Sequence, residues 1–377
     1  MAGYHIGINA HLLSGQAGYR RAGIHGYILN TLAHLPDADP ELRYTVFVGE
    51  GDPPPHARMA IRRSRLPTGH PVARILWEQV ALPGQASGLD LVHGMAFAAP
   101  LLTGRPSVVT VYDLSFLRYP QRLPAARRLY LRTVTGVSCR RARRVIAISR
   151  STAGDVHRLL SVPRERIDVA LPGVGEGFRP LPAQEVAAFR ERQGLPERFL
   201  LCLGTLEPRK NLPVLLEAYA RLPEATRRGA PLVLVGGKGW GWETLQATIA
   251  GLGLGDSVRL EGYAADEALP LWYNAATALA YPSVYEGWGL PVVEAMACGT
   301  PVLVSDASSL PEAVGEAGLR LPPHDVAAWA AGLHRALEDA TWRQQAAERG
   351  LARAATFTWQ ETARSHAQCY RRALEDG

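Results

Sequence analysis

Short apolar runs alternate with helical patterns along the chain, and this alternation restricts the fold more than any other feature of the sequence. In a parallel sheet, each strand is followed by a helix that crosses to the next strand, so this order predicts an α/β protein. In the first half, the strand-like runs lie at 5–10, 44–48, 89–93, 107–111, 144–148 and 167–170. Helical patterns intervene at 23–35, 72–82, 124–143 and 149–160.

The second half repeats this plan without repeating the sequence. Its strand-like runs lie at 199–203, 232–235, 257–260, 276–281, 301–305 and 319–321, and its helical patterns at 210–221, 242–251, 266–274, 290–298 and 325–338. A chain of 377 residues is also too long for one typical core. We therefore predict two Rossmann-like domains, 1–175 and 176–356, which are divided within a Gly/Pro-rich segment and followed by a last helix over 357–377.

The composition is that of a globular protein, with 47% hydrophobic and 20% charged residues. The four cysteines are far apart and form no CxxC pair, which favours buried thiols over disulfides or a metal site. The first residues, MAGYHIGINAHLL, lack the basic segment of a signal peptide, and no run of about 18 apolar residues occurs. We expect a cytoplasmic protein that is at most attached to a membrane surface.

The stretch YPSVYEGWGLPVVEAMACGTP, at 281–301, carries the strongest chemical signal. It places Glu286 before a Gly-Trp-Gly turn and Glu294 behind it, while Leu290-Pro291 opens a helix. A glycine turn that leads into a helix N-terminus forms an anion pocket. Two carboxylates on either side of such a pocket suit a nucleotide-sugar, whose diphosphate lies between two sets of hydroxyls. The alternative is an ordinary strand-turn-helix with two solvated glutamates.

The lysines are a second signal. Only Lys210 and Lys238 occur among 41 basic residues, and both follow apolar runs in loops marked by glycine or proline. Lysine provides a compact, mobile point charge, so its restriction to these loops favours phosphate binding. With so few lysines, a chance distribution is the alternative.

Several segments together resemble the retaining GT-B glycosyltransferases of family 4, and more narrowly their bacterial mannosyltransferase-like branch. Besides the Glu286/Glu294 spacing, they are GTLEPRKNL at 204–212, LVGGKGW at 234–240, VRLEGY at 258–263, TVYDLSFLRYP at 110–120 and VIAISRST at 145–152. The resemblance implies a GT-B fold, in which two Rossmann-like domains face each other across a cleft. It also implies that the last helix packs back on the first domain.

The same resemblance assigns roles in donor binding to residues of the second domain. Arg209 and Lys210, which follow the turn at Gly204, would stabilise the leaving diphosphate, and cations aimed there favour the transition state. Glu294 would bind the ribose and Glu286 the transferred sugar. Backbone N–H groups near the diphosphate and sugar would come from Gly287, Trp288, Gly289 and Leu290, and the base would lie near Gly262 and Tyr263. Tyr263 either stacks on the base or caps the core, and Lys238 either reaches a phosphate or is solvated.

The first domain is expected to bring the acceptor. Its glycine-rich loop at 14–25 would place Gly23 and Ile24 near the donor phosphates and Arg20 or Arg21 near the acceptor, although a surface turn is the alternative. Many family members have a histidine before the aspartate of the segment that here reads Val111-Tyr112-Asp113. The histidine's contact with the donor sugar would then be lost, or come from Tyr112, Asp113 or His93. Asp113 is the preferred acceptor-side contact or proton acceptor.

No DxD motif or metal-ligand cluster occurs among the segments that carry the donor motifs, so we predict no metal and no cofactor, with Arg209 and Lys210 neutralising the diphosphate. The prediction is a retaining hexosyltransferase that moves a hexose, preferably mannose, from a GDP- or UDP-sugar to a saccharide or lipid-linked acceptor. A nucleotide-sugar epimerase and a non-catalytic sugar-nucleotide-binding protein are the alternatives.

Basic residues concentrate in one region. Residues 118–166 contain thirteen arginines against two carboxylates. The segment 124–144 is interpreted as an amphipathic helix whose Arg140, Arg141, Arg143 and Arg144 dock on anionic lipid, or as a solvated helix. It lacks interleaved stacking aromatics, so we do not expect nucleic-acid binding.

Overall fold

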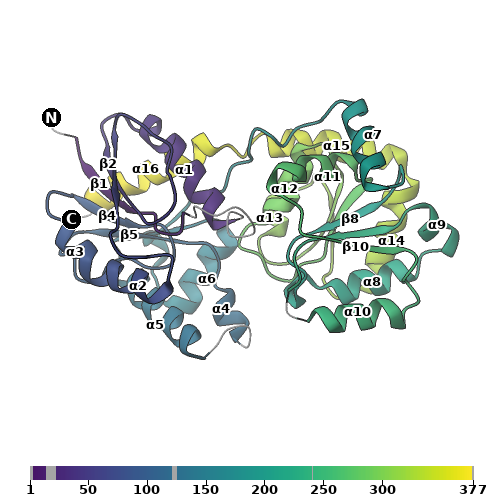
Figure 1. The fold of residues 1–377 in the computed structure, drawn as a ribbon, viewed down its shortest axis with the longest axis horizontal. Coiled ribbons are helices and arrows are strands. Elements are labelled where there is room, and N and C mark those ends of the chain that lie inside the picture. The colour runs from purple at the N-terminus through teal and green to yellow at the C-terminus, as the bar shows by residue number, and fades with distance from the viewer. Residues whose placement is uncertain (1–2, 14–22, 121–124, 240, 376–377) are drawn as a thin grey trace. The chain divides into compact units, whose positions relative to one another are not determined.

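A computed structural model describes residues 3–13, 23–120, 125–239 and 241–375. The chain forms two compact units. Unit 1 comprises residues 1–173 together with 358–377, and unit 2 comprises residues 174–357. Each unit contains one parallel sheet covered by helices (Figure 1).

The sheet of unit 1 has seven strands in the order β3-β2-β1-β4-β5-β6-β7. All of its paired strands are parallel. The strands are β1 (His5–Asn9), β2 (Arg43–Val48), β3 (Met59–Arg63), β4 (Leu91–Gly94), β5 (Ser107–Val111), β6 (Arg144–Ala147) and β7 (Ile167–Val169). The strand order reverses between β1 and β4, which is where open α/β sheets form a ligand-binding crevice.

The helices of unit 1 cover this sheet. They are α1 (Ile24–Ala38), α2 (Pro71–Leu76), the π-helix η2 (Trp77–Ala81), α3 (Leu82–Gln85), α4 (Ser115–Arg118), α5 (Ala125–Arg141), α6 (Arg150–Leu160), the 3₁₀ turn η4 (Arg164–Arg166) and α16 (Trp359–Glu375). Helix α16 packs along α1 and buries Trp359, His366 and Tyr370 (Figure 1). The last helix of the chain is therefore part of the N-terminal unit.

The sheet of unit 2 has six parallel strands in the order β10-β9-β8-β11-β12-β13. They are β8 (Leu200–Leu203), β9 (Leu232–Val235), β10 (Val258–Gly262), β11 (Ala278–Tyr281), β12 (Val302–Ser305) and β13 (Leu319–Leu321). Counted along the chain, this is the order 3-2-1-4-5-6 of a dinucleotide-binding fold, and its switch point lies between β8 and β11.

Unit 2 has more helical segments than the sequence pattern predicts. They are α7 (Ala183–Gln193), η5 (Pro208–Lys210), α8 (Leu212–Ala220), α9 (Glu224–Gly229), α10 (Trp242–Gly251), η6 (Asp266–Ala268), α11 (Leu269–Ala275), α12 (Leu290–Ala297), α13 (Leu310–Val314), α14 (Val326–Glu338) and α15 (Ala340–Ala354). The central strands β8, β9, β11 and β12 are buried along their length, as expected when helices cover both faces of a sheet.

The most informative difference from the predicted strands is β3. Four of its five residues are exposed and two of them are arginines, so it has no apolar run that could mark it. It lies at the edge of the sheet, where charged side chains protect an open strand from pairing with another chain. In the described part of the chain, no helix is both long enough and apolar enough to cross a bilayer.

Candidate functional site

The candidate site lies at the carboxyl ends of β8 and β11, the two strands at the switch point of unit 2. The chain leaves β8 through Gly204 and turns through η5, which carries Arg209 and Lys210. It leaves β11 at Tyr281 and passes through Glu286 to the start of α12. Because neighbouring parallel strands end at the same edge of the sheet, these two segments meet although they are more than 70 residues apart.

Three charged side chains converge at this point. The Lys210 Nζ atom lies 2.7 Å from Glu286 Oε1, and an Arg209 Nη atom lies 2.7 Å from Glu286 Oε2. All three side chains are largely buried. Oε1 of Glu286 also accepts hydrogen bonds from the hydroxyls of Ser283, at 2.7 Å, and Tyr281, at 3.1 Å. Glu286 therefore holds both cations in the structure.

These contacts determine the ionisation of the cluster. Burial alone would raise the pKa of Glu286, but the charges of Arg209 and Lys210 outweigh it and hold the pKa well below its ordinary value. Burial would lower the pKa of Arg209, but Glu286 and Glu207 raise it. The carboxylate and the guanidinium thus both remain charged at neutral pH. The Arg209 guanidinium also donates to the carbonyl of Tyr285 at 3.0 Å, which fixes its orientation.

Gly204 allows Lys210 to lie against the backbone. Its φ is +129°, and a Cβ atom at this position would lie 3.3 Å from both Cε and Nζ of Lys210. A side chain at position 204 would therefore be strained and would crowd the ammonium group. The glycine predicted from the sequence is a requirement of the cluster's packing.

Glu294 lies in the second turn of α12 and not in the first turn, where the sequence analysis put it. Its Oε2 accepts a hydrogen bond of 2.8 Å from the hydroxyl of Tyr273. Burial raises the pKa of Glu294 to about 7, since Tyr273 only partly opposes this effect and Asp266 adds to it. The two glutamates of the motif therefore differ: Glu286 is neutralised by cations, while Glu294 has a neutral partner.

The turn between the two glutamates is held from within unit 2. The hydroxyl of Ser309 donates to the carbonyls of Glu286 and Trp288, at 3.0 and 2.9 Å. The indole of Trp288 is buried and meets Phe357 edge-on at 5.1 Å between ring centroids, so only the backbone of this residue can serve a ligand. Gly289 has a φ of +103° and precedes Leu290, the first residue of α12.

Three other predicted donor residues lie at or after the ends of the neighbouring strands β9 and β10. Lys238 is exposed, and its Nζ lies 4.9 Å from the centroid of the Trp242 ring. Gly262 ends β10 with a φ of +74°. Tyr263 is 50% exposed, so of its two predicted roles the structure contradicts the core cap.

In unit 1, the loop at 14–22, including Arg20 and Arg21, lies outside the described residues. Gly23 caps α1 with a φ of +63°, and Ile24 is the first residue of that helix. Asp113 follows β5 at the carboxyl edge of the sheet, where its Oδ1 accepts a hydrogen bond of 2.8 Å from the backbone N–H of Ser115. The half-buried Asp113 therefore shapes the turn into α4, and no described hydrogen bond uses its second oxygen.

Two alternatives to the missing histidine are wrong. The Tyr112 side chain is buried, and its hydroxyl donates to the carbonyl of Met95 at 2.7 Å. His93 is fully buried, and its ring nitrogens lie 2.8 Å from the hydroxyls of Tyr370 and Thr110. The polar atoms of both side chains are hydrogen-bonded inside unit 1, so neither side chain can replace the histidine's contact with a sugar.

The proposed basic membrane face also needs correction. Arg144 belongs to β6 and not to the helix, and it is buried against Asp168, with the Nε–Oδ2 pair at 2.6 Å. Arg143 is half-buried and donates to the carbonyl of Ala373 at 3.4 Å. The helix ends at Arg141, because β6 begins only three residues later. The four arginines thus do not form one exposed helical face.

The sequence alone did not identify several neighbours of these residues. Tyr281, Ser283 and Tyr273 contact the two glutamates, and Glu207 pairs with Arg209. In unit 1 it missed a buried polar group at the end of β1, where Asn9 donates to Glu78 at 3.1 Å and His11 stacks on Trp77 at 3.9 Å between ring centroids. The one signal that the sequence offers for these residues is their position. Each lies at the end of a strand, in the loop after a strand or on a helix next to that edge.

Among the described residues, no group of three or more His, Cys, Asp or Glu side chains is placed to hold a metal ion. The four cysteines, Cys139, Cys202, Cys298 and Cys369, are all buried and unpaired with one another. Burial raises the pKa of Cys139, Cys202 and Cys298 to about 12, so these thiols are inert at neutral pH.

Comparison with known proteins agrees with this geometry. The family model for glycosyl transferases group 1 matches residues 185–353, and that for glycosyltransferase family 4 matches residues 22–176. The O-antigen chain mannosyltransferase B of Escherichia coli is 37% identical over 271 residues, which are 72% of this chain and 71% of that protein. The serotype-specific mannosyltransferase WbdA of Escherichia coli is 32% identical over 239 residues, 62% of this chain but 29% of the relative.

The fold has solved counterparts. The structure of Anabaena Alr3699/HepE in complex with UDP and glucose has a TM-score of 0.76 and 20% sequence identity, and the match covers 98% of this chain and 99% of that one. Sucrose-phosphate synthase from Thermosynechococcus elongatus also has a TM-score of 0.76, at 24% identity, with 99% of this chain and 100% of that one covered. The matched families, the identity to a mannosyltransferase over most of both chains and the two parallel-sheet units together show that this chain belongs to the GT-B glycosyltransferases of family 4.

Proposed function

We propose that this glycosyltransferase moves a hexose, with mannose preferred, from a nucleoside-diphosphate sugar to a saccharide or lipid-linked acceptor, with retention of configuration and without a metal ion. The observation that carries the proposal is the convergence of Arg209 and Lys210 at the switch point of unit 2. Two preorganised cations at the carboxyl edge suit a diphosphate, since a phosphate accepts readily from arginine and lysine.

The chemical role of these cations follows from where charge develops. When the bond between the sugar and the phosphate breaks, the leaving oxygen gains negative charge. Arg209 and Lys210 are held in place before the reaction, so they need no reorganisation to stabilise that charge. A divalent ion commonly does this work in phosphate chemistry, and two fixed cations can take its place.

Glu286 positions these cations in this proposal. Its two oxygens hold Lys210 and Arg209 on the same carboxylate, which keeps both charges at one place while no diphosphate is present. Along the chain, Glu286 is followed at once by the turn at Gly287 to Leu290, which leads to the N-terminus of α12. A sugar attached to the bound diphosphate would therefore lie beside Glu286, as the family resemblance implies.

Glu294 would bind the ribose. An ionised carboxylate accepts hydrogen bonds from both hydroxyls of a cis-diol. The hydrogen bond from Tyr273 restrains one oxygen of Glu294. No described hydrogen bond or ion pair joins this carboxyl group to a cation. Tyr263, which is half exposed at the end of β10, is available to stack on the base.

For the acceptor we propose unit 1, with Asp113 as a contact to the attacking hydroxyl. Retention is explained by a front-face reaction, in which an oxygen of the leaving phosphate takes the acceptor's proton. Among the residues we assign to the donor, Glu286 has a carboxylate engaged by four neighbours, which makes it a poor nucleophile.

The choice of sugar and acceptor rests on relatives. Two of them are named as mannosyltransferases, one of them for the O-antigen chain, and this favours mannose and a polysaccharide acceptor. A structural neighbour was solved with UDP and glucose, so GDP- and UDP-sugars both belong in the test.

Unit 1 also offers a surface for a lipid-linked acceptor. Val72, Leu76 and Val80 follow one another at four-residue spacing and are each more than 50% exposed. Tyr130 of α5 interacts electrostatically with Arg74 of α2 and Glu78 of η2. An exposed aliphatic row beside a basic helix suits the surface of an anionic bilayer.

The test is an assay of the full-length protein with GDP-mannose, GDP-glucose, UDP-glucose and UDP-galactose, each with and without a panel of lipid-linked saccharides. Without an acceptor we expect slow hydrolysis of the donor, and with the right acceptor we expect an α-linked product. Both reactions should proceed without added metal and in the presence of EDTA. Interconversion of the sugars would identify an epimerase, and binding without turnover a non-catalytic protein. Either result would contradict the proposal.

A further inference from the structure

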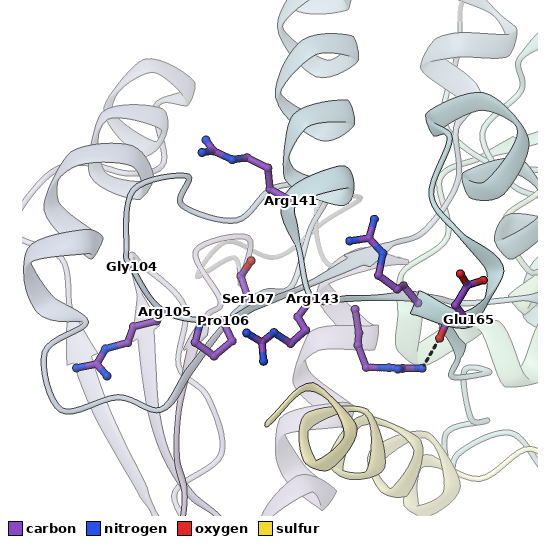
Figure 2. Close-up of a pocket in the computed structure, with 9 residues that line it drawn as sticks. Gly104, Arg105, Pro106, Ser107, Arg141, Arg143 and Glu165 are labelled. Carbon is purple, nitrogen blue, oxygen red and sulfur yellow. Dashed lines mark hydrogen bonds between the residues drawn. The ribbon is translucent and has the colours of Figure 1, made fainter. Parts of the chain in front are cut away.

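A second basic site lies in unit 1, at the opposite edge of its sheet from the carboxyl ends of the strands. Here β5, β6 and β7 begin, at Ser107, Arg144 and Ile167. The segments before these strands enclose a pocket of about 700 Å³ (Figure 2). It is lined by Gly104, Arg105, Pro106, Ser107, Arg141, Arg143, Arg144, Glu165 and Arg166.

The pocket holds five arginines and one carboxylate. The arginines come from three separate segments: the loop before β5, the end of α5 with the link to β6, and η4 (Figure 2). A chance cluster on a single helix face would not have this origin. An anion that enters the pocket would be attracted by those arginines that have no carboxylate partner among the described residues.

The pocket arginines are held in two different ways, by a carboxylate or by backbone carbonyls. Of the five, Arg144 is buried and pairs with the carboxylate of Asp168. Arg166 instead donates to two backbone carbonyls, of Ala142 and Arg140, at 3.3 and 3.2 Å. A carbonyl orients a guanidinium without neutralising it, so the positive charge remains available.

Unused donors remain in the pocket. The Nε atom of Arg166 is buried, and no described residue accepts a hydrogen bond from it. Arg143 makes one long bond, to the carbonyl of Ala373 at 3.4 Å. The side chains of Arg105 and Arg141 are exposed and have no hydrogen-bonding or ion-pair partner within the described part of the chain.

We propose that this pocket binds a phosphate-bearing anion and that it is separate from the donor site of unit 2. Arginine forks match the oxygens of a phosphate in pairs, and neutral anchors prepare them without competing for the ligand. The volume suits a diphosphate or a sugar phosphate. The ligand is either a soluble phosphate compound or the phosphate of a lipid headgroup, because both present the same oxygens. The proposal does not depend on the function proposed above.

The test measures the binding of inorganic pyrophosphate by calorimetry at low salt. The full-length protein carries Lys210→Ala throughout, so that the proposed donor site contributes little. In this background we compare the double variant Arg105→Ala/Arg141→Ala with Arg62→Ala/Arg65→Ala. The control pair removes the same charge from exposed arginines on and beside β3, at the far edge of the same sheet.

We expect the pocket variant to bind pyrophosphate about tenfold more weakly or worse, and the control pair to stay within about twofold of its parent. Equal effects of the two pairs would overturn the proposal, because they would reflect net charge alone. Loss of all pyrophosphate binding in Lys210→Ala alone would also overturn this proposal. That result would still agree with the donor site proposed for unit 2.

A second measurement identifies the source of the phosphate. Co-sedimentation uses vesicles of phosphatidylcholine alone or with about one third phosphatidylglycerol, which supplies anionic phosphodiesters. If the pocket variant loses binding to the anionic vesicles more than the control pair does, the ligand is a lipid headgroup. If vesicle binding is equal for both pairs while pyrophosphate binding is lost only in the pocket variant, the ligand is soluble.

Discussion

The two sheets have the same strand order around their switch points, yet they present different side chains there. In unit 2, the carboxyl edge gathers Arg209, Lys210 and Glu286 in contacts of 2.7 Å. In unit 1, the corresponding edge has Tyr112 and His93, whose polar atoms are satisfied inside the core. The shared topology gives each unit a switch point, and the residue types there decide which ligand chemistry each edge suits.

The described polar groups at this edge of unit 1 also differ in kind from those of unit 2. Its Asn9–Glu78 pair and His11 are polar groups, and of these His11 is neutral at pH 7. Burial raises the pKa of Glu78 and lowers that of His11 to about 4, with Arg74 adding to the second shift. Neutral hydrogen-bonding groups suit a sugar acceptor, whereas fixed cations suit an anionic donor.

The largest expected effect is the loss of turnover when Lys210 of unit 2 is replaced. Lys210→Ala should reduce kcat by about 100-fold or more, because it removes a major electrostatic stabiliser of the leaving group. Circular dichroism should show an unchanged fold. Arg228→Ala, on the exposed side of α9, is the matched control and should leave turnover unchanged. Normal turnover in Lys210→Ala would remove this lysine from the leaving-group role.

The two glutamates should separate in a crossed test. Glu286→Gln should reduce kcat about 100-fold while the bare nucleoside diphosphate still binds. It should also destabilise the free protein by about 3 kcal/mol, since Arg209 and Lys210 lose their shared carboxylate, and bound diphosphate should restore part of this. Glu294→Gln should instead weaken diphosphate binding about tenfold with little change in kcat.

Calorimetry, thermal unfolding and turnover on both variants check this pair. If Glu286→Gln weakens binding of the bare nucleotide as much as Glu294→Gln does, the two carboxylates do not serve opposite ends of the donor.

A smaller effect should appear in the pH dependence of nucleotide binding. Burial raises the pKa of Glu294 to about 7, so the carboxyl ionises as the pH rises from 6 to 8. The ionised form accepts stronger hydrogen bonds from a diol, which should tighten binding by about 1 kcal/mol, or about fivefold. The pKa of Glu294 is higher in the folded protein than in the unfolded chain. The contribution of this group to the free energy of unfolding is therefore complete below its ordinary pKa and is lost as the pH rises through about 7.

The control for this titration is Glu294→Gln. The phosphates of the ligand also titrate in this range, so the informative quantity is the ratio of wild-type to variant affinity at each pH. A ratio that stays constant from pH 6 to 8 would show that Glu294 does not titrate there.

The smallest expected effect is in unit 1. Tyr112→Phe removes the hydrogen bond to the Met95 carbonyl and should cost about 1 kcal/mol of stability. Turnover should stay within about twofold, since the buried hydroxyl reaches no substrate. Chemical denaturation and a standard assay measure the two quantities. A tenfold fall in kcat would restore Tyr112 as a sugar contact and weaken the contrast between the units.

Much of the architecture follows from local pattern. The run at 107–111 becomes β5 and the helical pattern at 242–251 becomes α10, because periodicity and turn residues act over a few residues. The exposed edge strand β3 has no such pattern, and sequence alone did not predict it. The π-helix η2 likewise has no periodicity of its own and merges with α2 and α3 into one predicted helix.

The residues of the donor motif were also predictable as a set, since they lie at the ends of strands or the starts of helices. Their partners were not. The ion pair between Lys210 and Glu286 joins residues 76 apart, and it forms because β8 and β11 are neighbours in the sheet. Strand order is a property of the whole fold, so a local pattern cannot specify which loops meet.

The sequence by itself determined the two α/β units, the glycosyltransferase family and the positions of its charged motif, because these depend on local periodicity and on residue types at fixed spacing. Only the tertiary structure decided that Glu286 holds both cations, that His93 and Tyr112 are structural and that Arg144 is buried against Asp168. The arginine pocket of unit 1 was likewise decided only by the tertiary structure. Each of these depends on burial and on contacts between distant segments, and both arise only when the chain is packed.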